Sequence, residues 1–164
     1  MNEISFGDAT LADIPGIQET ARASWYETYK DIFTGQFIGE FLARAYSTEN
    51  LRRSLKNDGS DFLVARDNEQ VVAFCHFGPT YREIAPTEIE LYRIYVRPNY
   101  WRIGIGGRLL EMMEARLIAQ NIEQYFCYVH SDNAIGKNFY LRRHFEHLPE
   151  YDRDNEYCLI KHLL

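Results

Sequence analysis

The 164-residue sequence has few of the features that mark a secreted, membrane or metal-binding protein. Its three cysteines, Cys75, Cys127 and Cys158, are too widely spaced for a disulfide framework or a zinc site. No apolar run approaches the roughly 20 residues that cross a bilayer, and the first residues lack a basic start and an apolar signal segment. We therefore expect a cytoplasmic protein with buried thiols, no membrane association and no metal.

An excess of basic residues is also missing. The sequence has 18 Lys and Arg against 24 Asp and Glu, a formal net charge of -6. Nucleic-acid binding needs basic patches that neutralise phosphates, so this composition argues against a nucleic-acid partner. An acidic balance instead favours the attraction of a cationic small molecule.

The apolar periodicity predicts one α/β (α+β) domain over residues 1–164, because a chain of this length with 46% hydrophobic residues can bury one sizeable core. A strand, a helix and another strand near the middle of the chain imply a right-handed crossover and a parallel pair. We expect a mixed, mostly antiparallel sheet with helices on both faces. The expected strands are 4–6, 61–65, 70–77, 87–96, 124–130, 145–148 and 157–163, and the expected helices start near 10, 34, 47, 105 and 133.

The strongest local signal lies in residues 94–110, where an apolar strand runs through a proline and a glycine-rich turn into a helix. Gly104, Gly106 and Gly107 lack the Cβ atoms that would hold a ligand away from the main chain. Successive amides can then point at an anion beside the positive end of the helix. This pattern predicts a pyrophosphate cradle, although it matches neither a dinucleotide-binding fold nor a P-loop.

Two motifs in this order resemble those of the GNAT (Gcn5-related N-acetyltransferase) superfamily. The first is Gln/Arg-x-x-Gly-x-Gly/Ala after a strand that ends in Leu/Ile-Tyr-Val-x-Pro, here residues 94–98 and 104–106. The second is Asn-x-x-Ala-x-x-Phe-Tyr-x-x-x-Gly-Phe, similar to residues 133–145. The sequence departs from these motifs at Trp101, Arg102, Gly136 and His144. The resemblance covers nearly the full chain and implies the GNAT fold, with a splayed central parallel pair, and an acetyl-CoA-dependent N-acetyltransferase.

The resemblance also implies the residues that bind the coenzyme. Backbone groups of the strand would pair with the pantetheine arm, the turn would hold the diphosphate, and Arg102 would add a charged contact. Asn133 is a candidate as well, with a helix N-cap as its alternative role. The predicted set is Ile94, Tyr95, Val96, Arg102, Ile103, Gly104, Ile105, Gly106, Gly107, Asn133 and Tyr140.

Two residues are candidates for catalysis. Relatives place the general acid for the coenzyme sulfur at the position of Tyr140, for which simple core packing is the alternative. Glu90 lies four residues before Ile94, where several relatives carry a catalytic glutamate, and strand alternation places both on one face. Action through a water chain and a solvent-side position are its alternatives. His76 and His130 are expected to be packed rather than catalytic.

Aromatic and acidic residues at 25–33 suit a polyamine or another small cationic amine as acceptor. Trp25, Tyr29 and Glu90 are the substrate candidates, with helix packing as the alternative for the two aromatics. Residues 24–32 and 128–136 resemble spermidine/spermine acetyltransferases of the PaiA type. A protein or peptide N-acetyltransferase and a non-catalytic coenzyme A sensor stay open, as do the physiological acceptor and the oligomeric state, a homodimer included.

Overall fold

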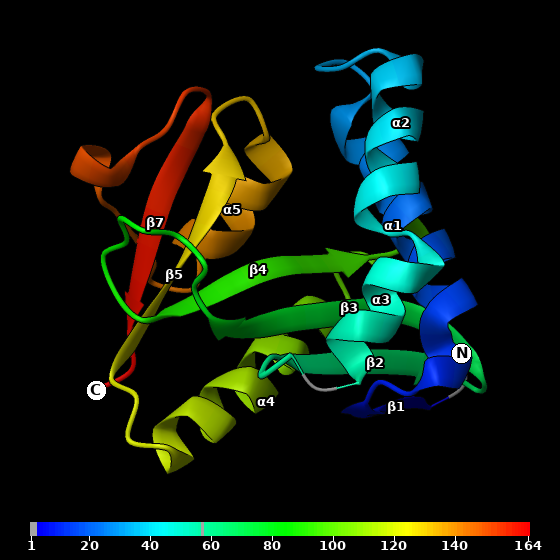
Figure 1. The fold of residues 1–164 in the computed structure, drawn as a ribbon, viewed down its shortest axis with the longest axis horizontal. Coiled ribbons are helices and arrows are strands. Elements are labelled where there is room, and N and C mark those ends of the chain that lie inside the picture. The colour runs from blue at the N-terminus through cyan, green and yellow to red at the C-terminus, as the bar shows by residue number, and fades with distance from the viewer. Residues whose placement is uncertain (1–2, 57) are drawn as a thin grey trace.

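The computed structural model describes residues 3–56 and 58–164. Within them, seven strands form one sheet in the order β1-β2-β3-β4-β5-β7-β6 (Figure 1). Strands β4 and β5 are parallel, and the other neighbouring pairs are antiparallel, which confirms the predicted mixed sheet. The bounds are β1 Ile4–Asp8, β2 Asp61–Asp67, β3 Gln70–Pro79, β4 Ile89–Val96, β5 Gln124–His130, β6 Glu146–His147 and β7 Glu156–His162.

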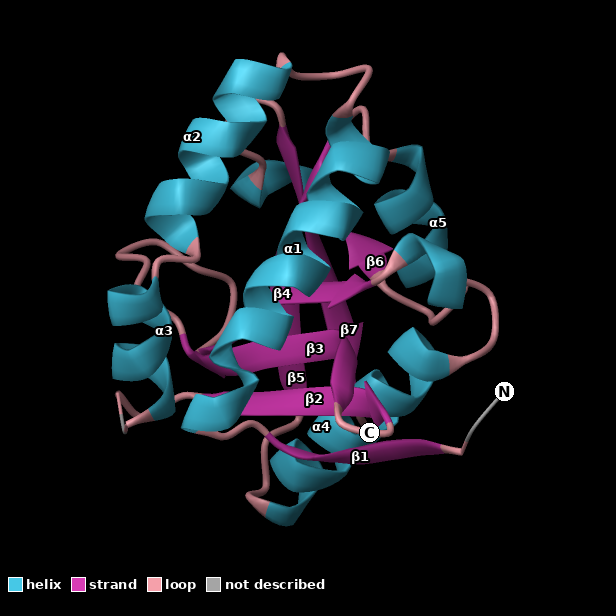
Figure 2. Ribbon diagram, turned by 90° about the vertical axis from the view of Figure 1, so that its right-hand side faces the viewer, coloured by secondary structure: helices cyan, strands magenta, loops and turns pink. Residues whose placement is uncertain are grey.

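Five α-helices of the described chain cover both faces of the sheet (Figure 2). Helices α1 to α3 lie over one face, and α4 and α5 over the other. Local sequence sets where two of them begin, since the hydroxyls of Thr34 and Ser47 accept backbone N–H groups of the first turns at 3.1 Å. The bounds are α1 Ile14–Tyr29, α2 Gly35–Ala45, α3 Thr48–Leu55, α4 Ile105–Ala119 and α5 Ala134–Leu141.

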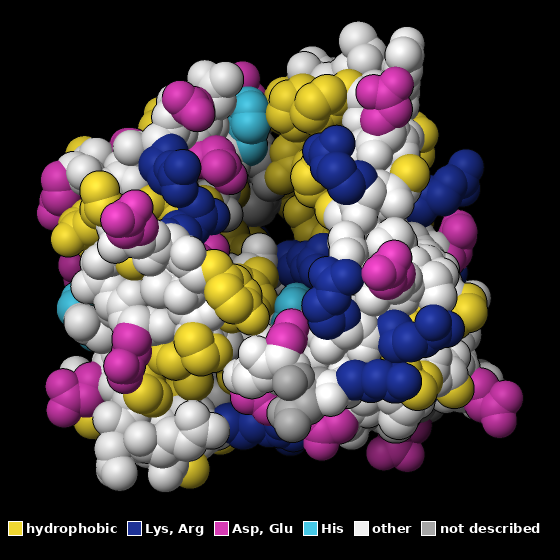
Figure 3. Space-filling model, in the orientation of Figure 1, with side chains coloured by type: hydrophobic (Ala, Val, Ile, Leu, Met, Phe, Trp, Pro, Cys, Tyr) yellow, Lys and Arg dark blue, Asp and Glu magenta, His cyan; other side chains and the backbone are white. Residues whose placement is uncertain are grey.

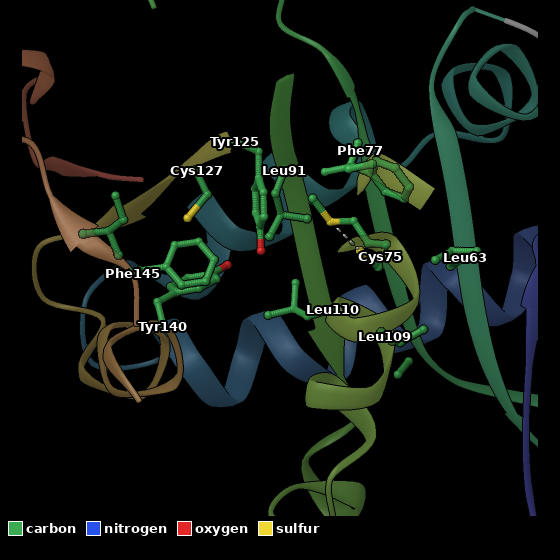
Figure 4. Packing of buried hydrophobic residues seen from close by; sticks show 14 of the residues in the cluster. Leu63, Cys75, Phe77, Leu91, Leu109, Leu110, Tyr125, Cys127, Tyr140 and Phe145 are labelled. Carbon is green, nitrogen blue, oxygen red and sulfur yellow. Dashed lines mark hydrogen bonds between the residues drawn. The ribbon is translucent and has the colours of Figure 1, made fainter. Parts of the chain in front are cut away.

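The core on the α4 side holds two of the three cysteines (Figure 4). Cys75 lies 3.8 Å from the sulfur of Met113, and Cys127 lies beside Tyr140. Cys158 is also buried, all three are free, and burial raises the pKa of each thiol. The prediction of buried thiols is therefore confirmed. In the described ranges, no helix is both long and apolar enough to traverse a bilayer.

The parallel pair at the centre of the sheet is short. In the described structure, β4 and β5 pair at a single position, Glu90 with Phe126, and then diverge (Figure 1). Backbone groups of β4 beyond Glu90 therefore lack a strand partner on the β5 side. This confirms the splayed pair and leaves a gap at the middle of the sheet.

A β-bulge changes which residues of β4 share a face. His76 pairs with Arg93 and Phe77 with Leu91, so Tyr92 is an extra residue in the strand. Because of it, Leu91 packs in the α4-side core with Ile94, while Glu90 faces the α1 side. The prediction that Glu90 and Ile94 share a face was wrong, because strict alternation holds only in a strand without a bulge.

Candidate active site

Two cavities in the described structure meet at the splayed strands. One, of about 600 Å³, lies between β4, the start of α4 and α5; the other, of about 1080 Å³, lies between β4, the helices α1 to α3 and the ends of β5 and β7. Figure 3 shows the molecule hollowed between the side that holds β5 and β7 and the side that holds α1 and α2. We call the first cavity the turn cavity and the second the helix cavity. Their shared wall residues are Tyr29, Tyr92, Arg93, Tyr95 and Tyr128.

The glycine-rich turn forms the start of α4 and one wall of the turn cavity. Gly104 precedes the helix with φ of 90°, and a Cβ there would meet nothing within 4 Å, so this glycine serves the backbone conformation. At Gly106 a Cβ would lie 2.9 Å from the ring of Phe139, so close packing also requires glycine. The unpaired N–H groups of the first helical turn make this a site suited to an anion.

Arginines add to the positive potential of the turn cavity. Apart from Arg93, which also lines the helix cavity, its described wall contains Arg102, Arg142 and Arg143 and no Asp or Glu, in a chain whose net charge is -6. Arg143 stacks on the Phe139 ring, 3.9 Å from its centroid, and donates to the Phe139 carbonyl at 2.9 Å. This charge distribution and the helix start fit a ligand with several phosphates. Acetyl-CoA is such a ligand.

The free edge of β4 also lines the turn cavity. The Arg97 amide donates to Val72 at 2.8 Å, so the alternate residues Ile94 and Val96 direct their backbone groups away from β3. However, the Val96 carbonyl accepts hydrogen bonds from Trp101 Nε1 at 2.6 Å and Ser24 Oγ at 2.8 Å. Both of its lone pairs are occupied, which corrects the expectation that this carbonyl is open to a ligand.

Tyr140, in α5, and Asn133, the N-cap of that helix, both line the turn cavity. Tyr140 is buried, which raises its pKa well above the ordinary value, so its phenol stays protonated at neutral pH. The Asn133 side chain accepts from the Gly136 amide at 2.9 Å and donates to the Tyr29 hydroxyl at 3.3 Å. The N-cap role of Asn133 is confirmed, and its contact with a coenzyme stays a prediction.

The predicted coenzyme residues line the turn cavity with one exception. Ile103 does not line it, and its side chain is 46% exposed. The other predicted residues are Ile94, Tyr95, Val96, Arg102, Gly104, Ile105, Gly106, Gly107, Asn133 and Tyr140, and all of them lie in the wall.

In the helix cavity, the aromatic candidates and Glu90 are present, but the acidic residues expected from positions 25–33 are not. Trp25 stacks on Phe41 and packs at a tilt against Tyr29, with centroids 4.2 Å apart in each pair, and both Trp25 and Tyr29 are buried. Both residues therefore have the packing role that was their alternative, and both also line the helix cavity. Glu27 points outward and pairs with Lys30 at 3.0 Å. The carboxylates in the described wall are instead Asp58, Glu90 and Glu156.

Glu90 faces the helix cavity at the end of the paired segment. It is 6% exposed, so the solvent-side alternative was wrong. Its carboxylate accepts from Arg82 Nε at 3.1 and 3.2 Å and from the Thr80 hydroxyl at 2.8 Å. Arg82 in turn lies 4.2 Å above the Tyr128 ring. These contacts fix the position of the Glu90 carboxylate beside the splay.

The two histidines of the helix cavity are held by local contacts. His76 is buried, which, together with the charge of Arg93, lowers its pKa to about 3, so it is neutral at pH 7. Its Nδ1 faces Arg93 Nε at 3.4 Å, and its Nε2 faces the Ser60 hydroxyl at 2.8 Å. His130 Nδ1 accepts from the Asp132 amide at 3.1 Å, so in the neutral ring Nε2 carries the proton. Neither is arranged as a base.

Several wall residues were not predicted from the sequence. Tyr92 is the bulged residue of β4, and Arg93 lies on the same face of the strand as Tyr95. Arg142 and Arg143 follow α5, at positions where the second motif specifies no residue type. Arg93 is marked in the sequence as the second charged residue, besides Glu90, of a largely apolar strand. The bulge itself leaves no such mark.

A sheet split at its centre, with an arginine-lined cavity beside a glycine-rich helix start, defines an acyl-CoA-dependent transferase. Residues 22–145 match the acetyltransferase (GNAT) family, so the chain belongs to this family. It is an acetyl-CoA-dependent N-acetyltransferase, as the two motifs predicted.

Known proteins resemble this chain in sequence, in fold or in both. A spermidine N(1)-acetyltransferase of Thermoplasma acidophilum is 28% identical over 141 residues, which cover 84% of each chain. The crystal structure of the PaiA N-acetyltransferase of Thermoplasma acidophilum in complex with coenzyme A superposes with a TM-score of 0.88 and 26% identity, over 98% of this chain and 99% of that one. A GNAT acetyltransferase of Staphylococcus aureus shares the fold, with a TM-score of 0.75 and 15% identity over 99% and 100%.

Proposed function

We propose that this enzyme transfers the acetyl group of acetyl-CoA to the primary amine of a small molecule, with the thioester in the turn cavity and the amine in the helix cavity. The observation that carries the proposal is the meeting of the two cavities at β4, where five residues belong to both walls. A direct transfer between two ligands needs such a junction, because the reacting atoms must come within about 3–3.5 Å.

On the coenzyme side, amides of residues 104–107 with Arg102, Arg142 and Arg143 take the diphosphate. The backbone groups of Ile94 and the N–H of Val96 pair with the pantetheine amides as an added strand would. Tyr140 donates its proton to the departing thiolate, whose conjugate acid has a pKa of about 8.5. The coenzyme A bound by the PaiA protein of Thermoplasma acidophilum supports this assignment.

On the amine side, a proton must leave the acceptor before or during attack. A primary ammonium has a pKa of about 10.4, so roughly one molecule in a thousand is neutral near pH 7. Glu90 is the carboxylate of the helix cavity that lies on β4 at the splay. We assign it as the base, acting on the amine directly or through a water molecule.

The volume of the helix cavity, about 1080 Å³, is at the upper end of the range of small-molecule sites, which favours a small acceptor over a protein or peptide. The relative named spermidine N(1)-acetyltransferase supports a polyamine as that acceptor. The presence of both Glu90 and Tyr140 supports an enzyme over a coenzyme A sensor.

A panel assay tests the proposal. Release of free coenzyme A from acetyl-CoA is followed with polyamines, amino acids, other small primary amines and peptides, and products are identified by mass spectrometry. We expect acetylation of at least one small amine and none of the peptides. If coenzyme A binds but no amine is acetylated, the sensor function replaces the proposed one; acetylation of peptides alone would favour the protein-directed alternative.

A further inference from the structure

Arg93 lies at the junction of the two cavities and is held in one orientation. Its Nε donates to His76 Nδ1 at 3.4 Å, one terminal nitrogen lies 3.4 Å from the Ala45 carbonyl, and the guanidinium lies 4.4 Å above the Tyr46 ring. His76 is itself anchored through Ser60. All of these partners are uncharged, and the Arg93 side chain lines both cavities.

No carboxylate of the described chain pairs directly with Arg93; the nearest one in its hydrogen-bonded chain is Asp58, which is reached only through His76 and Ser60. Among residues 3–56 and 58–164, no carboxylate oxygen lies within 4.0 Å of its guanidinium. The nearby imidazole of His76 is neutral at pH 7. A half-buried guanidinium without a counter-ion is costly unless a ligand supplies the negative charge.

A site for a purely cationic ligand would have an excess of acidic residues, and the described wall of the helix cavity does not. Arg82 pairs with Glu90, so that carboxylate is compensated within the protein. Arg53 and Arg93 add two further positive charges to the wall, against Asp58 and Glu156. In the described wall, acidic and basic groups are therefore balanced, which suits a ligand that carries both signs.

The coenzyme is not the source of the missing negative charge. Its pantetheine arm is uncharged, and its phosphates belong at the turn after Pro98. Arg93 precedes the end of β4 by three residues, or about 10 Å of extended chain. An anion that reaches Arg93 therefore comes with the other ligand.

We propose that Arg93 binds an acidic group, a carboxylate or a phosphate, of the same small molecule whose primary amine is acetylated. The inference rests on the proposed function and narrows its acceptor from any small amine, a polyamine included, to an amine that also carries an acid. Arginine suits this role because its remaining N–H groups can donate charge-assisted hydrogen bonds to either anion. In this assignment the amine lies toward Glu90 and the acid toward the α3 end of the helix cavity.

Matched pairs of amines test the proposal. Each pair compares an acid-bearing amine with its acid-free counterpart: lysine with 1,5-diaminopentane, ornithine with 1,4-diaminobutane, and 2-aminoethyl phosphate with ethanolamine. We expect kcat/KM for at least one acid-bearing member to exceed that of its counterpart by about tenfold to a hundredfold. The third pair separates phosphate from carboxylate. Equal or better use of the acid-free member in every pair, or of spermidine over all of them, would overturn the proposal.

Substitutions of Arg93 assign any preference to this residue. In Arg93→Gln the ratio within the preferred pair should fall toward one, mainly through a higher KM for the acid-bearing amine, and Arg93→Lys should lie between. Arg22→Gln removes an exposed arginine on α1 outside both cavities and should leave the ratio unchanged. Thermal unfolding and coenzyme affinity establish that each variant folds. A ratio that survives Arg93→Gln contradicts the proposal.

A binding measurement tests the role of Arg93 even if no acetyl transfer is observed. Calorimetry with the coenzyme A-loaded protein measures binding of the same pairs without turnover. Tighter binding of the acid-bearing member that is lost in Arg93→Gln supports the role of Arg93 even when no acetyl transfer occurs. Binding that does not distinguish the members of any pair overturns it.

Discussion

The Nε atom of Arg82 lies 3.1 and 3.2 Å from the two carboxylate oxygens of Glu90. This ion pair joins the loop after β3 to the strand whose bulge turns Glu90 toward the helix cavity. The carboxylate proposed as base is therefore held at the splay by a residue far less buried than itself, since the side chain of Arg82 is 27% exposed and that of Glu90 is 8% exposed.

Glu90→Gln should lower kcat/KM by about a hundredfold or more, because a neutral amide accepts no proton. The loss should be greatest at low pH, where most of the amine is protonated. Steady-state rates from pH 6 to 9 check this. Arg82→Gln is the matched control: it removes the ion pair but keeps the carboxylate, so its rate should fall less. A loss in Glu90→Gln that does not vary with pH would argue against a base at this position.

Tyr140→Phe should lower kcat by about a hundredfold with little change in coenzyme A affinity, because only the proton donor is removed. Since burial raises the Tyr140 pKa well above its ordinary value, the wild-type rate should show no loss from this group up to about pH 10. Turnover and titration calorimetry provide the two readouts. An unchanged kcat would remove Tyr140 from the mechanism.

Tyr125→Phe is the control for loss of a buried phenol. Tyr125 donates to Glu114 at 2.7 Å and lies outside both cavities. Its substitution should cost about 1 kcal/mol of unfolding free energy and leave kcat unchanged. Chemical denaturation and the same rate assay separate this structural effect from the catalytic effect expected at Tyr140.

Gly106→Val should abolish measurable coenzyme A binding. The new side chain would meet the Phe139 ring, since a Cβ alone lies 2.9 Å from it, and would cover amides at the start of α4. Overpacking of this kind costs about 1–3 kcal/mol, so the variant should still fold. Calorimetry measures binding, and Gly35→Ala, where a Cβ meets nothing within 4 Å, is the control. Intact affinity in a folded Gly106→Val protein would refute the proposed cradle.

The parts of the fold and site that the sequence predicts are those where backbone requirements restrict residue type. Gly104 needs a positive φ, Gly106 lies against Phe139, and Asn133 caps α5, so motifs at these positions identify the family and the coenzyme side. The residues that line the helix cavity are instead brought together by tertiary packing. Tyr92 makes β4 one residue longer than its partner, and no local pattern announces this bulge. The face of the sheet on which Glu90 lies therefore follows only from the tertiary structure.

His76 makes the stability of the protein depend on pH. In the unfolded chain this histidine binds a proton below about pH 6.5, whereas in the folded protein its pKa is lowered to about 3 by burial and by Arg93. Between these values the unfolded state binds more protons, so the unfolding free energy falls as the pH falls. The slope from this residue approaches about 1.4 kcal/mol per pH unit.

His76→Gln should remove that slope, because glutamine does not titrate. Urea denaturation of both proteins between pH 7.5 and 4.5 should show the wild type losing stability faster on acidification, so that the difference between the two proteins changes steadily with pH below 6.5. His162→Gln, which removes an exposed histidine at the end of β7, is the control and should follow the wild type. Parallel curves for wild type and His76→Gln would show that the pKa of His76 is the same in the folded protein as in the unfolded chain. The folded histidine would then become charged below about pH 6.5 and could no longer accept a hydrogen bond from Arg93.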